Sequence, residues 1–158
     1  MKAQELVHKV EKSTVFTTFR KDHPDYYLAT VFFLENTGWT TGYYSKKEDR
    51  MITFTVDPVK QNPQDEVFKK DEFVTPLEID DVKISIDKAD EIIEKLHQEK
   101  YKVHDIVRKI ILIQNHGGLH FNVTLITKTF HVINVILDAI SGKVLKETIQ
   151  NAMSFQEK

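Results

Sequence analysis

The sequence contains no cysteine among its 158 residues. This absence excludes disulfide bonds, thiol catalysis and zinc sites built from thiolates. No stretch approaches the roughly 18 consecutive apolar residues of a membrane-spanning helix. The first thirteen residues, MKAQELVHKVEKS, carry charges where a signal peptide would need an apolar run. We therefore expect a cytoplasmic protein, or an extracytoplasmic one if a leader has been removed.

An excess of charge of one sign is also missing, because 22 basic and 24 acidic residues leave a net charge of −2. Without a basic field the sequence does not favour nucleic-acid binding, and we expect no membrane association. Hydrophobic residues make up 41% of the chain and charged residues 29%, which is typical of a globular protein rather than a disordered one. Ten Phe and five Tyr predict a well-filled core.

The clearest pattern is period-2 alternation of apolar and polar residues in the second half of the chain. It places Leu119, Phe121 and Val123 on one face of a strand, opposite His120 and Asn122. Many of the residues are β-branched or aromatic, which suits a half-buried sheet. The alternation predicts strands at 107–114, 119–127 and 130–138. Glycines predict the turns between and after them, at Gly117-Gly118 and at Gly142.

A strong amphipathic helix is predicted before these strands, at 87–100. Its apolar residues recur at helical spacing and form one buried stripe: Ala89, Ile92, Ile93 and Leu96. Asp87 is the expected N-cap. The first half has the same plan, with a helix at 2–12 before strands at 27–35, 39–45 and 51–57. Residues 13–20 stay ambiguous between a strand and a continuation of the helix.

The fold class predicted from this plan is α+β, with two tandem units, each a helix plus an antiparallel sheet, packed together. The N-terminal unit spans 1–57 and the C-terminal unit 79–158. Residues 58–78 hold three of the four prolines and form the linker. Val67, Phe68, Phe73 and Val74 let this linker pack on the surface, and Met153 and Phe155 are expected to anchor the tail.

The second half resembles the PepSY domain family over about residues 76–147. The matching features are the acidic lead-in Pro76–Asp87, the amphipathic helix Ala89–Leu96, and the closing segment Val135–Val144, in which Asp138 ends a strand and a turn that contains Gly142 leads into a new one. The first half is a possible degenerate second copy. The resemblance implies a cystatin-like shape and a role in restraining peptidases.

An aromatic group in the first half is the main candidate for a binding surface. Trp39 and Tyr43 share one strand face and Tyr44 points the opposite way, so a concave sheet could present these rings to a peptide or small ligand. The alternative, that they form a lid over the core, is favoured. His120 is added as a binding candidate on its own strand face.

Histidines offer a weaker possibility of a metal site. His116 and His120 flank the Gly117-Gly118 turn and could bind a metal with His131 or His104. No known zinc spacing matches, so ordinary turn and sheet histidines are preferred. We expect no metal and no cofactor.

Three functional hypotheses follow. The leading one is a non-enzymatic binding module, a monomer or homodimer, that offers a sheet face or strand edge to a protein or peptide partner. The alternative is a small-ligand-binding protein with a pocket between helix and sheet. The third is an enzyme in that pocket, which would need a buried His or carboxylate with a shifted pKa. The sequence has no nucleophile elbow, phosphate-binding glycine loop or HExxH motif.

Overall fold

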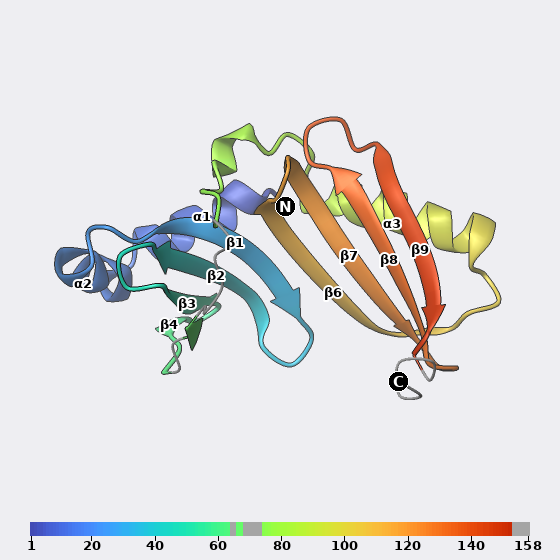
Figure 1. Cartoon of the computed structure of the whole chain (residues 1–158), viewed down its shortest axis with the longest axis horizontal. Coiled ribbons are helices and arrows are strands. Elements are labelled where there is room, and N and C mark those ends of the chain that lie inside the picture. The colour runs from blue at the N-terminus through green and yellow to red at the C-terminus, as the bar shows by residue number, and fades with distance from the viewer. Residues whose placement is uncertain (64–65, 68–73, 153–158) are drawn as a thin grey trace.

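The computed structural model describes residues 1–63 and 74–152, together with the backbone of residues 66 and 67. In this part of the chain, helices cover one face of an antiparallel sheet, and the other face of the sheet looks toward the viewer in Figure 1. The predicted α+β class is therefore confirmed.

The helices are α1 (Ala3–Glu11), α2 (Thr14–Asp22) and α3 (Ile86–Lys100), and a 3-10 turn, η1 (Ile79–Asp81), precedes α3. The strands of the first half are β1 (Tyr27–Leu34), β2 (Gly38–Ser45), β3 (Arg50–Val56), β4 (Val59–Gln61) and β5 (Glu66–Val67). Those of the second half are β6 (Ile106–Asn115), β7 (Leu119–Thr127), β8 (His131–Asp138) and β9 (Val144–Asn151).

The ambiguous segment after the first helix forms α2. The first helix ends before Ser13, and Ser13 is the N-cap of the new helix. Its hydroxyl oxygen accepts the N–H of Phe16 at 3.2 Å. Phe16 and Phe19 then fall on the buried side of α2. The burial of these two rings explains why β-branched residues in this stretch adopt a helix: packing overrides weak local propensity.

The predicted N-cap of α3 was wrong. Ser85 caps the helix instead of Asp87, because the Ser85 hydroxyl oxygen accepts the N–H of Lys88 at 3.0 Å. The earlier start brings Ile86 into the first turn, where its side chain is buried. Asp87 lies in that turn and accepts a hydrogen bond from the Met1 ammonium group. Ser and Asp are comparable caps, so burial of Ile86 decides between them.

The two halves of the chain join in one sheet with the strand order β4-β3-β2-β1-β6-β7-β8-β9, and β5 pairs with β3. Every pairing is antiparallel. β1 and β6 form the junction, and their register runs only from Thr30 opposite Gln114 to Phe33 opposite Ile111. Beyond this short ladder the two strands separate.

The closing turn of the second half is confirmed in detail. The Asp138 carboxylate accepts the N–H groups of Ile140 and Ser141 at 2.8 and 2.9 Å, and Gly142 has a φ of +80°. The new strand after Gly142 is β9, which continues to Asn151 and forms one edge of the sheet. Met153 and Phe155, the expected tail anchors, lie outside the described residues.

The predicted linker contributes to the sheet. Directly after Pro58 the chain turns back, and β4 pairs with β3. Val74 packs against a small cluster on the helix-free side of the sheet, formed by Ala29, Tyr44 and Met51. Phe68, Phe73 and the side chain of Val67 lie outside the described residues.

The main core lies between the helices and the sheet and is continuous across both halves of the chain. Its buried side chains come from all three helices and from strands of both halves. Tyr43 and Phe54 fill it under α2, where the Phe16 ring centroid lies 4.8 Å from that of Tyr43. Phe121 fills it in the second half. A shared core predicts that the halves unfold together.

Candidate functional site

The sheet face that carries no helix is the most extended candidate surface. It is defined here as the helix-free face of β1 and β6–β9, and its side chains follow from the strand register. Three rows of outward side chains cross this face: Phe32, Leu112, Asn122, Ile136 and Lys146; Ile110, Thr124, Asn134 and Thr148; Arg108, Ile126, Val132 and Gln150. The face therefore surrounds a central polar column, formed by Asn122 and Thr124 of β7 and Asn134 of β8, with mostly apolar side chains of β1, β6 and β8.

The apolar part of this face is concentrated at the junction of the two halves. Phe32 lies opposite Leu112, and Leu34 and Ile110 lie together one step further along the same strands. All four side chains are half-buried, although no helix covers them. Half-buried aliphatic and aromatic side chains on an open sheet stabilise it by packing on one another, and they leave an apolar surface available for contact.

The polar column at the centre of the face is held by one side chain. The Asn134 amide donates to the Asn122 side-chain oxygen at 2.6 Å and to the Thr124 hydroxyl at 3.2 Å. These bonds cross from β8 to β7 and use the side chains' own polar groups. The column is thus pre-ordered, which lowers the entropy that a partner would lose on binding.

One corner of the face carries a histidine and a carboxylate. His120 lies directly opposite Asp138 across β7 and β8. Backbone N–H groups of Ser141 and Ile140 lower the pKa of Asp138, and His120 contributes a smaller effect in the same direction. This carboxylate already has its partners in the closing turn, so its evident role is to hold the turn.

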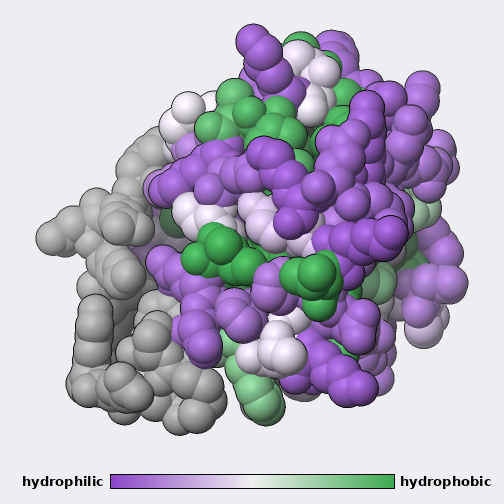
Figure 2. Space-filling view, turned by 90° about the vertical axis from the view of Figure 1, so that its right-hand side faces the viewer, coloured by the Kyte–Doolittle hydropathy of each residue, from purple (hydrophilic) through white to green (hydrophobic). Residues whose placement is uncertain are grey.

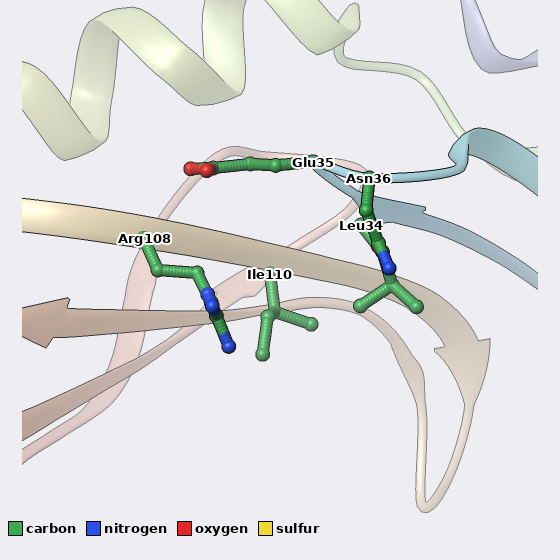
Figure 3. Close-up of a pocket in the computed structure, with 5 residues that line it drawn as sticks. All are labelled: Leu34, Glu35, Asn36, Arg108 and Ile110. Atoms are coloured by element: carbon green, nitrogen blue, oxygen red, sulfur yellow. The ribbon is translucent and has the colours of Figure 1, made fainter.

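A pocket of about 500 Å³ opens at the place where β1 leaves β6. It is lined by Leu34, Glu35, Asn36, Arg108 and Ile110. Figure 3 shows Leu34, Ile110 and Arg108 pointing to the same side, while the Glu35 carboxylate extends away from the Arg108 guanidinium. The Glu35 carboxylate accepts the N–H of Lys109 at 3.1 Å and thereby satisfies the backbone of β6 where β1 has ended.

The aromatic candidates lie on two sides of the sheet, as their alternation predicted. Trp39 and Tyr43 point to the helix side, where Trp39 is partly buried with its ring centroid 5.3 Å from that of Phe33. Tyr43 is 0% exposed, and burial and its bond to Glu11 raise the pKa of its phenol. Tyr44 lies on the opposite side, and its bond to Asp49 together with burial raises the pKa of Tyr44 to about 12.

The structure does not bring the predicted histidines together. His116 and His120 lie at the β6–β7 turn, whereas His131 begins β8 at the other end of β7, where its N–H donates to Thr127. Seven residues of β7 separate the two ends, which is roughly 20 Å. His131 pairs with His104, with ring centroids 4.7 Å apart. Among the described residues no three His, Cys, Asp or Glu side chains form a group that could hold a metal ion.

The space between α3 and the sheet, where the alternative hypothesis places a ligand, is occupied by side chains. Ile93 of α3 packs in the same buried cluster as Val123 and Val135. A groove of about 350 Å³ opens at the seam between α3 and β9, where its lining includes Ile92, Val144 and the charged residues Lys88 and Glu91. This groove is a surface feature at the rim of the core.

Arg108, Leu34 and the pair Asn122–Asn134 were not among the predicted site residues. The alternation of β7 and β8 already placed both asparagines opposite buried faces. What it could not provide was the register that puts Asn134 beside Asn122, or the pairing of β1 with β6 that creates the pocket. These depend on contacts between segments far apart in sequence.

Comparison with known proteins identifies a structural relative, and this similarity bears on the fold alone. No family model matches the chain, and no curated protein matches it. The chain is similar in structure to a protein from Clostridium difficile 630 that is provisionally identified as a lipoprotein. The similarity has a TM-score of 0.56 and covers 85% of this chain and 89% of that one, at 14% sequence identity. At that identity it shows the fold alone, and the PepSY resemblance stays a prediction. Within the described residues, no helix has the length and apolar character to cross a membrane.

Proposed function

We propose that this chain is a non-enzymatic protein-binding module whose contact surface is the helix-free face of β1 and β6–β9. The observation that carries the proposal is the composition of this face: a half-buried apolar junction around Phe32 and Leu112 beside a pre-ordered polar column at Asn122 and Asn134. Protein interfaces combine such apolar anchors with fixed polar groups.

The face is a better candidate than the free edge of the sheet. β9 is the edge strand of the second half, and its ladder with β8 is interrupted by a register shift close to Val144. Lys143 and Lys146 lie at this shift. Lysines and bulges are the devices by which natural edge strands resist pairing. Figure 2, which looks at this end of the molecule, shows hydrophobic residues separated by many hydrophilic ones.

The polar groups of the face favour binding over chemistry. Asn134 is bonded to Asn122 and Thr124, and Asp138 is bonded to its own turn. Each of these groups is engaged in holding the surface in shape. Among protein partners, peptidases are the class that the PepSY resemblance suggests, and they enter the proposal on that ground.

The test compares two substitutions of the same kind on opposite sides of the protein. Thr124→Arg places a large cation in the centre of the helix-free face, and Thr17→Arg places it on the exposed side of α2. Peptides are selected from a random library displayed on phage against the wild-type chain. Their affinities for wild type and both variants are then measured, with far-UV circular dichroism as the control for folding.

We expect most selected peptides to bind Thr124→Arg at least about tenfold more weakly than wild type, and Thr17→Arg as well as wild type. A parallel assay measures the cleavage of a fluorogenic peptide by purified peptidases with each variant present. Inhibition that Thr124→Arg abolishes would identify the partner class. Selected peptides that bind both arginine variants equally would overturn the proposed face.

A further inference from the structure

The pocket at the β1–β6 junction contains a cation next to an apolar floor. Arg108 is exposed at one end of the pocket, and Leu34 and Ile110 form the floor beside it. The Asn36 side chain supplies an amide on the Leu34 side. An arginine fork beside an apolar surface is suited to a carboxylate that is carried next to an apolar group.

Arg108 differs from the charged groups around it because it has no partner among the residues that the structure describes. Within residues 1–63 and 74–152, its guanidinium makes no hydrogen bond or ion pair. The neighbouring charges are engaged elsewhere. Glu35 accepts the Lys109 N–H, and the Lys109 ammonium pairs with Asp90 of α3 at 2.8 Å. The Glu35 carboxylate is turned away from the guanidinium (Figure 3), so Arg108 is the charged group that lies beside the apolar floor of the pocket.

We propose that this pocket receives an acidic side chain, Asp or Glu, that a partner protein carries next to an apolar side chain. The inference rests on the proposed function and names the chemistry that the helix-free face recognises. The carboxylate binds the Arg108 guanidinium, and the apolar neighbour lies on Leu34 and Ile110. The Asn36 amide donates a further hydrogen bond at the rim.

The carboxylate comes from a side chain rather than from the C-terminus of a peptide. Sites that capture a chain terminus use several free backbone N–H groups. Here the pocket is lined by residues of β1, β6 and the turn after β1, and the N–H of Lys109, where β6 extends past β1, already donates to Glu35. The donors offered here are side chains, the Arg108 guanidinium and the Asn36 amide, and they suit a carboxylate carried on a side chain.

The experiment uses three capped probes and the ¹⁵N-labelled full chain. The probes are acetyl-Gly-Leu-Glu-Leu-Gly-amide, the same peptide with Gln in place of Glu, and acetyl-Gly-Leu-Leu with a free carboxyl terminus. Each is titrated into wild type, Arg108→Gln and the control Lys146→Gln, which removes the same charge elsewhere on the same face. Chemical shifts of backbone amides and of the arginine side-chain N–H are followed, and the spectra also report folding.

We expect the Glu peptide to shift the signals of Leu34, Ile110 and Arg108 and to bind about fivefold more tightly than the Gln peptide. Arg108→Gln should make the two peptides equivalent, whereas Lys146→Gln should preserve the difference. Raising the salt concentration should reduce the difference, because the contact is exposed.

Equal binding of the Glu and Gln peptides on this face would overturn the carboxylate inference and leave the proposed face intact. Equal binding of the free-terminus peptide would overturn the choice of a side-chain source. Shifts away from the face, or none at all, would also overturn the inference. The phage-selected peptides then decide separately whether the face itself binds.

Discussion

The helix-free face of the sheet is covered in the first half of the chain and open in the second half. In the first half, Ala29, Tyr44 and Met51 are buried there, with Tyr27 and Val74 packed against them. In the second half, the equivalent face of β6–β9 remains half-buried and open. Both halves have alternating strands, so alternation alone does not distinguish a covered face from a recognition face. What differs is the segment at Val74, which returns across the first half only.

The halves also differ in how their helices are tied to the sheet. In the first half, the fully buried strand residue Tyr43 donates its phenol to Glu11 of α1 at 3.0 Å. In the second half the roles are exchanged. Tyr101, the residue that ends α3, donates to Glu147 of β9 at 2.9 Å, and Lys100 bonds the same carboxylate at 3.0 and 3.1 Å. The phenol of the second tie is the more exposed of the two, because Tyr101 is half-buried and Tyr43 is fully buried.

The largest expected effect tests whether the halves share one core. Phe54→Ala and Phe121→Ala each remove a fully buried ring, one from each half, and should lower the free energy of unfolding by about 3–5 kcal/mol. Unfolding is followed by the fluorescence of Trp39, which reports the first half, and by circular dichroism, which reports both. The two probes should give one coincident transition in each variant.

Phe130→Ala is the control for this pair, because Phe130 is 61% exposed in a turn and its loss should have little effect. A Phe121→Ala variant in which Trp39 retained its wild-type midpoint would show that the halves unfold separately. The continuous core would then be two cores in contact.

An intermediate effect is expected from the closed face. A methyl group added at Gly42 would lie 2.4 Å from the Thr30 hydroxyl oxygen and 3.0 Å from the Met51 sulfur. Gly42→Ala should therefore destabilise the protein by about 1–3 kcal/mol in urea denaturation. A matching enlargement on the open face, Thr148→Ile, should change stability by less than about 0.5 kcal/mol.

The double variant Gly42→Ala/Thr30→Ala removes the Thr30 hydroxyl oxygen, which is the atom closest to the added methyl group. This double variant should recover much of the stability that Gly42→Ala loses. If the double variant were no more stable than Gly42→Ala, the close packing of the first half would not be the cause. If Thr148→Ile were equally destabilising, the two faces would not differ as described.

The smallest effect concerns the tie at Glu147. Its bonds to Lys100 and Tyr101 lower the pKa of Glu147 in the folded protein. Because the folded pKa lies below the unfolded value of about 4.3, the tie stabilises the protein above that pH and loses its effect as the pH falls through the folded pKa. Glu147→Gln should cost about 0.5–1 kcal/mol at pH 7 and almost nothing at the acid end.

Urea midpoints of wild type and Glu147→Gln, measured from pH 7 downward, check this sign. Lys100→Gln serves as the partner variant, and its cost should not add to that of Glu147→Gln. A difference between wild type and Glu147→Gln that persists or grows in acid would mean that the carboxylate is not held in its charged form.

The local elements of this protein were largely predictable because their signals are local. Alternation located the strands, and the helical spacing of Ala89, Ile93 and Leu96 located α3 and its buried side. The one error in the helices, at Ser85 and Asp87, arose where two local signals compete, and the segment of α2 stayed ambiguous because its local signals disagree. In both places the burial of nearby apolar side chains decided the outcome.

The candidate site was only partly predictable. Alternation correctly placed His120 on one face with Asn122, and it separated Trp39 and Tyr43 from Tyr44. It could not show that Trp39 and Tyr43 face the helices, because period 2 defines two faces without saying which one is covered. Arg108 carries no local signal at all, since one exposed arginine in a strand resembles any other.

The sequence by itself determined the α+β class, the turns at Gly117-Gly118 and Gly142, and which residues of each strand share a face, because steric preferences and hydrophobic periodicity act over a few residues. Only the tertiary structure decided that β1 pairs with β6, that the helices take one face, and that Arg108 lies beside Leu34 in one pocket. The physical reason is that such contacts join segments far apart in the chain, where the packing of the whole core chooses the arrangement.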